Sequence, residues 1–307
     1  MALNEWGTSE TSSKRALFCN REIGQTLGML ELCRGFCAFA LSAGLIGCQS
    51  LPEAKPVESP LQPGRADAPS QVTPTEAIRN AEVYCNHAWR PFARNILHGA
   101  DRRGVRVDTP DTSYQPPSGL KGWWVPGEVN VGMPYKWGGF DSPEIFDAGI
   151  ANGLAGGDVS SPAKRAADNA AVSEESVGVD CSGFVSRCLK LPRAYDSSQL
   201  PSICDPIADP LDLRPGDILN IPREHVMLVA GWAKPDKSWI LYYETGGIPD
   251  WKPALKLSPL SKLLELGFQP LRYHGMAREE RPTGKEVLTR SAIAKAIFIP
   301  DPIVGAP

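Results

Sequence analysis

The chain has 307 residues, of which 42% are hydrophobic and 8% aromatic, and this is enough apolar material for a folded core. Such a composition excludes an intrinsically disordered chain. The formal net charge is −3 and no run of lysine and arginine stands out, so nucleic acid is not an expected partner.

The N-terminal region has the features of an export signal. Arg34 precedes an apolar run of about a dozen residues, which is the length of a signal-peptide core, whereas a membrane-spanning helix needs about 20. The run ends in LIGC, residues 45–48, which resembles the lipobox of bacterial lipoproteins, where the cysteine is acylated. We therefore expect residues 1–48 to be a signal peptide, with lipidation at Cys48. An uncleaved apolar anchor and a core helix are the alternatives.

Residues 49–75 are rich in proline, serine and alanine and show no apolar periodicity, so we expect a flexible linker. By the same resemblance, Gln49 after the cysteine suits sorting to the outer membrane. These features predict an exported protein that a lipid anchor holds in the cell envelope. The leader before the apolar run is long and contains acidic residues, so either Met1 or Met29 is the start of translation.

The folded part is expected to open with a helix in residues 75–92, capped by Thr75. Apolar residues recur there at helical intervals: Ala77, Ala81, Val83, Tyr84 and Ala88. A polar, turn-rich segment follows to about Gly119, and together these residues form a predicted helical N-terminal extension over 76–130.

A second, short helix is predicted after Asp141 and Glu144, because their D-x-x-E spacing is typical of a helix start. Residues 155–177 are rich in alanine, glycine and charge. We expect this segment to cover one face of the domain rather than to enter its core.

Cys181 lies at the predicted start of a third helix. One apolar face runs beneath it, with residues three, four, seven and eight positions on: Phe184, Val185, Cys188 and Leu189. Asp180 or Ser182 can cap this helix, and the free amides and dipole at a helix start stabilise a thiolate. A cysteine at a helix start is usually structural, so the catalytic interpretation depends on partners elsewhere.

Those partners are predicted in a downstream hairpin. His225 opens an apolar strand, and a second strand ends at Glu244. A turn at Lys234–Pro235 would pair His225 with Glu244 on one face of the sheet, which completes a nucleophile, base and orienter. Tyr242, two residues earlier on the same face, is the competing third residue, whereas a one-residue slip would turn Tyr243 toward the site.

Four motifs resemble, in order and type, those of the NlpC-type cell-wall cysteine peptidases, a papain-like family: GMPYKWGG, VDCSGFV, LRPGDIL and HVMLVAGW. The likeness covers about Val131 to Met276 and places the peptidase domain at residues 131–280. It implies an α+β papain-like fold, in which the nucleophile helix packs on a central antiparallel sheet. It also implies hydrolysis of amide bonds in peptidoglycan stem peptides, commonly between D-glutamate and a diamino acid.

The resemblance also implies roles for individual residues. These are Cys181 as nucleophile, His225 as general base, Tyr135 as a cleft residue beside the thiol, and Trp137 of the same motif as a further substrate contact. Asp180 and Ser182 either hold the free amine of a stem peptide, as in relatives, or only cap the helix. Two features depart from the family: the long insertion over 140–179, and Glu244 where a histidine or a neutral polar residue is more common.

The remaining cysteines and histidines are expected to be structural. Cys85, Cys188 and Cys204 have no close C-x-x-C spacing, so neither a metal nor a cofactor is expected. Because exported proteins form disulfides, a Cys188–Cys204 disulfide is an alternative to two free thiols. His87 and His98 are expected to be surface or packing residues, and His274 is a rival base.

Several alternatives stay open at this stage. Trp123 and Trp124 either pack or line a groove. The same fold could belong to an amidase or acyltransferase with another substrate, or to a cell-wall-binding lipoprotein without activity. Residues 281–307 are either a last strand or a docking tail, and the oligomeric state is open.

Overall fold

The computed structural model describes residues 71–116, 119, 121–246, 250–278 and 297–298, all within one unit of the chain. The signal peptide, Cys48 and nearly all of the linker lie outside these residues, as does most of the C-terminal tail. In the described part, no helix combines the length and the apolar character needed to cross a bilayer.

Helices and strands are mixed along the described chain, and the α+β class is confirmed. The α-helices are α1 (Pro74–Asn86), α2 (Pro143–Ala151), α3 (Pro162–Ala167), α4 (Cys181–Cys188) and α5 (Leu260–Glu265). Short 3-10 turns are η1 (Ala93–Asn95), η2 (Asp168–Ala171), η3 (Leu200–Ile203) and η4 (Pro210–Asp212). The strands before α4 are β1 (Ala88–Trp89), β2 (His98–Ala100), β3 (Arg106–Asp108), β4 (Asn130–Val131), β5 (Ala155–Gly156) and β6 (Ser176–Val177). Those after it are β7 (Cys204–Pro206), β8 (Ile218–Ile221), β9 (His225–Trp232), β10 (Trp239–Glu244), β11 (Ala254–Pro259), β12 (Gln269–Tyr273) and β13 (Ile297–Phe298).

The main sheet has seven strands in the order β13-β11-β10-β9-β8-β12-β7. Every neighbouring pair is antiparallel except β11 with β13. The central antiparallel sheet expected for the domain is therefore present. Part of the predicted tail, β13, is a strand of this sheet.

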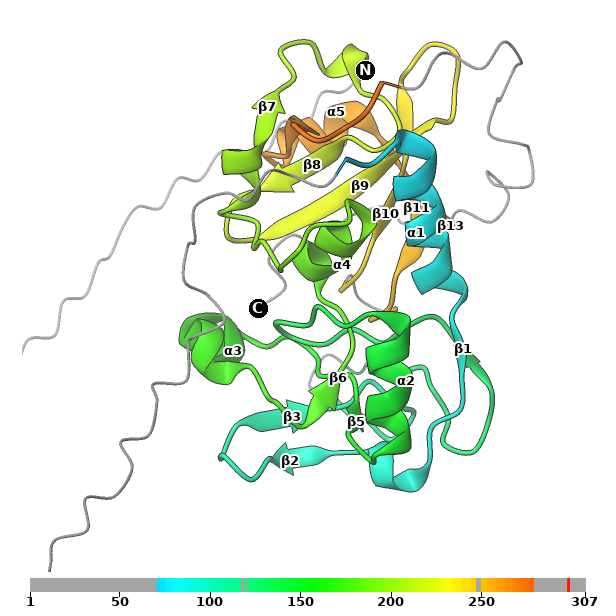
Figure 1. Ribbon diagram of the computed structural model, residues 1–307, viewed down its shortest axis with the longest axis vertical. Helices are drawn as coiled ribbons and strands as arrows, with labels where there is room; N and C mark the ends of the chain where they lie inside the picture. Colours follow the sequence, from blue (N-terminus) through cyan, green and yellow to red (C-terminus); the bar gives the residue numbers. More distant parts are fainter. Residues whose placement is uncertain (1–70, 117–118, 120, 247–249, 279–296, 299–307) are drawn as a thin grey trace, which may run out of the picture. The chain divides into compact units, whose positions relative to one another are not determined.

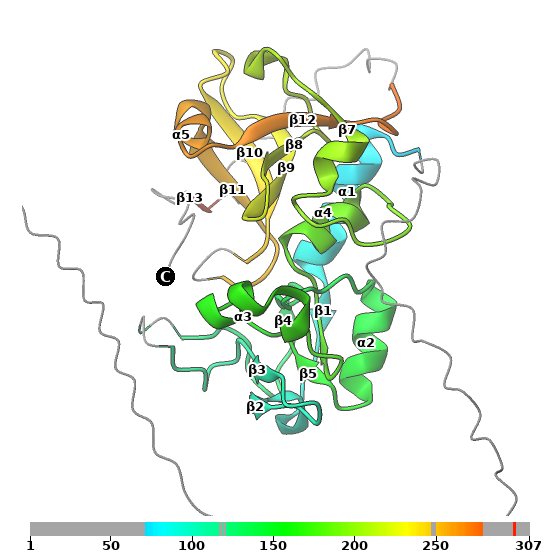
Figure 2. The ribbon, with the colours of Figure 1, turned by 90° about the vertical axis from the view of Figure 1, so that its left-hand side faces the viewer.

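Two apolar layers cover the sheet, one on each face (Figures 1 and 2). On one face α1 and α4 pack together against inward residues such as Val226, Leu228 and Tyr243. On the other face, α5 packs against residues that alternate with these, such as Val229 and Tyr242. The strands thus alternate between two buried faces, and α4 lies in one of the layers.

Helix α1 begins earlier than predicted. Thr73, not Thr75, is its N-cap: the Thr73 hydroxyl accepts a hydrogen bond from the Glu76 amide (3.2 Å), and the Glu76 carboxylate accepts one from the Thr73 amide (2.9 Å). This is a capping box, in which each residue satisfies a free amide of the other. Just before it, Val72 pairs with Met276, so the described fold begins ahead of residue 75.

The segment 88–130 differs from the helical extension expected there. Its described residues form the 3-10 turn η1 and short strands, of which β1 pairs with β4, and β2 with β3. The many glycines and prolines in this segment are compatible with short strands and turns but not with long helices. Figure 1 shows these strands grouped with α2, β5 and β6.

The insertion 155–177 was expected outside the core, and this is wrong for both of its ends. β5 and β6 form a parallel pair, and Ala155 and Val177 are buried. Between them, α3 carries Lys164, whose ammonium group is buried against Asp158 at 2.7 Å.

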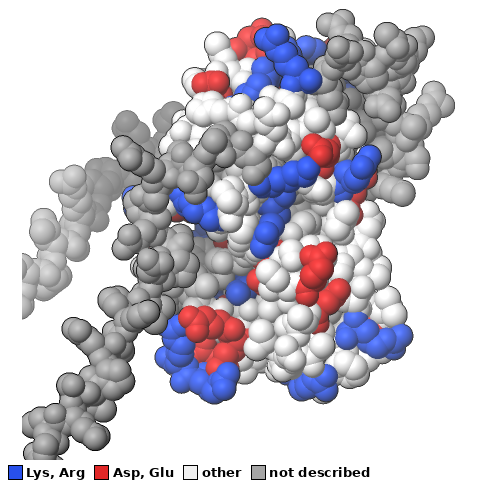
Figure 3. All heavy atoms as spheres, viewed as in Figure 1, with Lys and Arg blue, Asp and Glu red and all other residues white. Residues whose placement is uncertain are grey.

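On the face drawn in Figure 3, acidic and basic side chains are interspersed and form no large patch of one charge.

The hairpin of β9 and β10 has a different register from the predicted one. Tyr243 pairs with Leu228, so Glu244 comes level with Met227 rather than His225. A bulge interrupts the ladder, because Leu241 pairs with Gly231 whereas Tyr242 pairs with Val229. This one extra residue keeps Glu244 and His225 on the same face of the sheet, despite the changed register.

Candidate active site

Cys181 is the first residue of α4, as predicted, and its position is fixed by the cap before it. The Asp180 carboxylate accepts hydrogen bonds from the Gly183 amide (2.6 Å) and the Ser182 hydroxyl (2.9 Å). The capping function of Asp180 is thus confirmed. Burial raises the pKa of Asp180, although the hydrogen bonds from Gly183 and Ser182 oppose the shift.

The first turn of α4 packs directly on the loop that carries the GMPYKWGG motif. The Asp180 amide donates to the carbonyl of Gly139 (3.0 Å). A Cβ atom on Gly183 would lie 1.9 Å from the same carbonyl oxygen, so only glycine allows this approach. Below it, the predicted apolar face is buried: Phe184, Val185, Cys188 and Leu189. The contacts of α4 with the Gly139 loop and with the core fix the position of the Cys181 thiol.

His225 lies between the thiol and a carboxylate. Its Nε2 atom is 2.8 Å from Oε2 of Glu244, and the Cys181 thiol lies close enough to the ring to raise its pKa. Burial by itself would lower the pKa of His225, but the charge and hydrogen bond of Cys181, followed by those of Glu244, raise it to about 10. The three residues come from α4, β9 and β10, so folding brings together the predicted set.

Glu244 is almost fully buried, with 6% of its side chain exposed, and it has two cationic partners. Its second oxygen, Oε1, is 3.0 Å from the ammonium group of Lys256. Burial would raise the pKa of Glu244, whereas His225 and then Lys256 lower it to about 2. Glu244 is therefore a carboxylate throughout the neutral range. Tyr242, the competing third residue, instead bonds the Ser258 hydroxyl in the second core layer.

Lys256 and its other partner, Asp250, were missed by the sequence analysis. In β11, Lys256 and Ser258 alternate with Leu255 and Leu257, a pattern typical of a strand with one solvent-exposed face. In the structure this polar side is the more buried one: Lys256 and Ser258 are buried, whereas Leu255 and Leu257 are half-buried. Lys256 pairs with Tyr242 and so faces the layer that contains α5. The sequence pattern by itself contained no signal for this pair.

Tyr135 lies beside the thiol, as the resemblance implied. Burial and the neighbouring charges of Cys181 and Asp180 raise the pKa of Tyr135. Its ring packs against Gly246, where a Cβ atom would lie 2.6 Å from the ring, and its amide donates to the Trp251 carbonyl (2.8 Å). Trp137 packs on the same aromatic group and donates its indole N–H to the Asp168 carbonyl (3.2 Å).

The other cysteines differ from Cys181 in their surroundings. All four described cysteines are free, so the Cys188–Cys204 disulfide does not form. Cys188 packs in the layer of α1 and α4, whereas Cys204 begins β7 at the sheet edge. Burial raises the pKa of both Cys85 and Cys204 to about 12 and also raises that of Cys188. These three thiols are therefore poor nucleophiles.

The remaining histidines and tryptophans have structural partners. His274, the rival base, is half-exposed and lies 3.2 Å from Asp205. His87 contacts Asp147 at 2.8 Å, and His98 contacts Asp111 at 2.9 Å. The indole N–H groups of the tryptophan pair donate to backbone carbonyls: Trp123 to Trp251, and Trp124 to Gly156. The packing interpretation is confirmed for Trp124, which is fully buried, whereas Trp123 is half-buried and its role stays a prediction.

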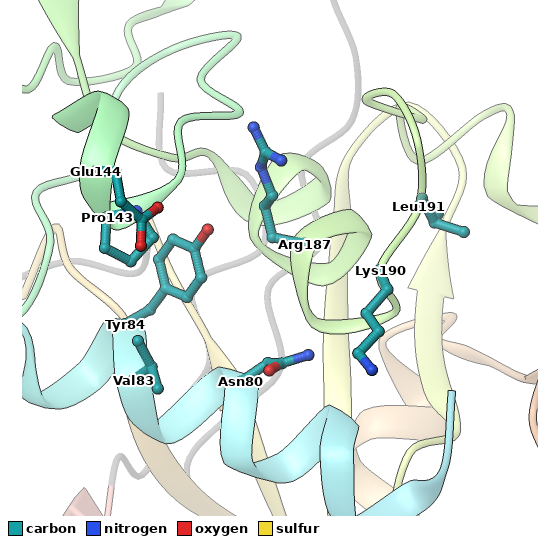
Figure 4. Close-up of a pocket in the computed structure, with 8 residues that line it drawn as sticks. All are labelled: Asn80, Val83, Tyr84, Pro143, Glu144, Arg187, Lys190 and Leu191. Carbon is teal, nitrogen blue, oxygen red and sulfur yellow. The ribbon is translucent and has the colours of Figure 1, made fainter. Parts of the chain in front are cut away.

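A cavity of about 420 Å³ opens at the far end of α4 (Figure 4). Its walls come from α1, the start of α2 and the end of α4: Asn80, Val83, Tyr84, Pro143, Glu144, Arg187, Lys190 and Leu191. No predicted site residue is among them. Within the part of the chain that the structure describes, no group of histidine, cysteine and acidic residues is arranged to hold a metal ion.

Comparison with protein-family models, with curated proteins and with solved structures found no match.

Proposed function

We propose that this chain is a cysteine peptidase of the NlpC type, with a papain-like fold, which hydrolyses amide bonds in peptidoglycan stem peptides. One observation carries the proposal: His225 lies 2.8 Å from the buried carboxylate of Glu244 and close enough to the Cys181 thiol for the thiol to raise its pKa. A nucleophile, a base and an orienting acid in mutual contact are the requirements of covalent acyl transfer. The four motifs supply the substrate class through their resemblance to the family.

The first half of the reaction forms a thioester. The thiolate sulfur of Cys181 attacks the carbonyl carbon of the scissile amide, and the negative charge develops on the carbonyl oxygen. The positive end of the α4 dipole, where Cys181 lies, stabilises this oxyanion. His225 then gives its proton to the amide nitrogen, the C–N bond breaks, and the amine leaves.

The second half releases the acid. A water molecule gives a proton to His225 and attacks the thioester carbon, and the C–S bond breaks to restore Cys181. Glu244 accepts a hydrogen bond from Nε2 of the ring, so Nδ1 is the nitrogen that serves the thiol. The carboxylate stabilises the imidazolium that both halves of the reaction require.

We also propose that the protein is lipid-anchored at Cys48 in the cell envelope. The LIGC sequence after an apolar run supports this location. An envelope location brings the enzyme to its polymeric substrate.

Digestion of purified peptidoglycan with the full chain tests the reaction. We expect the wild type to release stem-peptide fragments whose masses identify the broken bond, and Cys181→Ser to release none while it keeps its circular dichroism spectrum. The matched control is Cys204→Ser, which changes a buried thiol that has no role in the reaction and should keep activity. Fragments from Cys181→Ser, or activity lost equally in Cys204→Ser with its fold intact, would contradict the proposal. If the wild type leaves peptidoglycan unchanged but Cys181 reacts fast with acyl donors, the substrate class is wrong.

A further inference from the structure

Lys256 lies inside the main sheet rather than at its surface. Its neighbours across the ladders are Tyr242 on β10 and Ile297 on β13, and only 2% of its side chain is exposed. The ammonium nitrogen is 3.0 Å from Oε1 of Glu244 and 3.1 Å from Oδ2 of Asp250. Both contacts are ion pairs by distance, and among the described residues this nitrogen has no partner in hydrogen-bond geometry.

A buried ammonium group is costly unless opposite charges compensate it. A lysine in this position is therefore stable only as part of a charged group that includes Glu244. The two oxygens of that carboxylate are divided between two cations, Oε2 facing His225 and Oε1 facing Lys256. Rotation of the carboxylate would break both contacts, so Lys256 restrains the oxygen that orients the histidine.

We propose that Lys256 is a positioning residue of the catalytic site, which acts through Glu244 by keeping its carboxylate ionised and turned toward His225. This rests on the proposed function only in taking His225 as the base for Cys181. It extends the Cys181, His225 and Glu244 set by one residue from a fourth element, β11. Lys256 contacts neither the thiol nor the substrate in this scheme.

The charged and titratable groups around Glu244 come from every strand next to it. They are His225 on β9, Tyr242 on β10, Lys256 on β11 and Asp250 in the segment before β11, with Cys181 on α4 acting through His225. Lys256 is one of two cations there, and the other is His225. When Lys256 is removed, Glu244 retains only His225 and binds a proton more readily.

The protein offers a matched comparison in Lys164. This lysine is equally buried and forms an ion pair with Asp158 at 2.7 Å, but its other contacts are backbone carbonyls of Arg106 and Ala171. Loss of Lys164 removes a buried ion pair without touching Glu244. Any effect of Lys256 that Lys164 does not reproduce is therefore specific to the site.

The test follows the rate at which iodoacetamide alkylates Cys181 as a function of pH, with the modified peptide identified by mass. This readout needs no substrate, so it stays valid even if the enzyme does not act on peptidoglycan. In Lys256→Met we expect protonation of Glu244 to weaken the thiolate–imidazolium pair, and the acid limb of the profile to move up by about one to three pH units. Lys256→Arg, which keeps the cation, should lie closer to the wild type, and Lys164→Met should keep the wild-type profile.

A folded Lys256→Met with the wild-type acid limb would overturn the proposal, and so would an equal shift in Lys164→Met. Because Lys256→Met leaves Glu244 with one partner fewer, the double variant Glu244→Gln/Lys256→Met provides a second test in which both charges are removed together. If Lys256 acts through Glu244, this double variant has the same profile as Glu244→Gln alone. Different profiles would show that Lys256 acts by another route, and the proposal would fail.

Discussion

At the scale of single residues, His225 is an imidazolium in a setting that would otherwise favour the neutral ring. Burial disfavours its charge, yet the thiol on one side and the carboxylate of Glu244 on the other raise its pKa to about 10. The proton that the leaving amine needs is therefore present at neutral pH.

Glu244→Gln tests this arrangement through the alkaline limb of the pH–rate profile. Gln cannot provide the negative charge, so the pKa of His225 should fall from about 10 and the imidazolium should be lost at lower pH. The alkaline limb of peptidoglycan hydrolysis should move down, and turnover should fall by up to about four powers of ten, as when an orienting carboxylate is neutralised. An unchanged alkaline limb would rule out Glu244 as the partner of His225. Glu265→Gln, an exposed change at the end of α5, is the control.

Sequence reasoning at this scale succeeded where residue type and motif order both carry information. Cys181, His225 and Glu244 lie in motifs or at strand ends, so the sequence predicts that they come together. Lys256 could not be identified, because its alternation with leucines describes a half-exposed strand equally well. Its burial comes from the layer on the face that it shares with Tyr242, where α5 packs against the sheet.

At the scale of elements, α4 and the loop before it form one tightly packed unit. The Gly139 carbonyl accepts a hydrogen bond from Asp180 and lies against the backbone of Gly183. The α4 helix itself was predictable, because its cap and apolar spacing are local. The contact of α4 with the Gly138–Gly139 loop joins residues that are far apart in the sequence. It forms because Gly183 has no side chain that would clash with the Gly139 carbonyl.

Gly183→Ala sets two effects against each other. Helix propensity favours alanine by about 1 kcal/mol, but its Cβ would lie 1.9 Å from the Gly139 oxygen, which is backbone and cannot simply rotate away. Overpacking of this kind costs about 1–3 kcal/mol, so we expect a lower melting temperature and a displaced, less reactive Cys181. Calorimetry and the alkylation rate measure the two effects. Gly99→Ala in β2 is the control, since its nearest neighbour would be 4.0 Å away; a more stable and fully reactive Gly183→Ala would refute the argument.

The register of β9 and β10 could not be predicted from the pattern of apolar residues. Alternating apolar residues fix which face each residue joins only while the ladder is regular. The bulge between Leu241 and Tyr242 changes the count by one, and both strands bury their apolar residues with or without it. The predicted contact of His225 and Glu244 forms, although the predicted pairing that led to it does not.

At the scale of the whole molecule, the sequence predicted the α+β class and the main sheet but not the small strands that precede α4. β1 to β6 have two or three residues each, too few for a periodic pattern. They are held by contacts with residues far away in the chain, such as the pairing of β1 with β4. The helical extension predicted over 76–130 is therefore wrong after α1, and the insertion predicted outside the core is wrong at both of its ends.

The proposed lipid anchor is a property of the whole molecule, and Cys48→Ala tests it. If LIGC is a lipobox, processing requires the thiol, so the variant should accumulate as an unprocessed precursor, while the wild type should leave membranes only with detergent. Fractionation and N-terminal sequencing distinguish the two. Cys37→Ala, within the apolar run but outside the LIGC sequence, is the control and should be processed normally. Wild-type protein free in the medium with another N-terminus would exclude the anchor.

The contacts of α1 also decide from which side the domain is held. Glu76 near the start of α1 pairs with Lys190, just past the end of α4, and Asn80 bonds the carbonyl of Cys188. Cys181 lies at the opposite end of α4, about 12 Å away along the axis at 1.5 Å per residue. The described chain thus begins near the end of α4 that lies opposite Cys181. Under the proposed anchoring at Cys48, a polymeric substrate would meet the thiol at the other end of α4 from the one where the described chain begins.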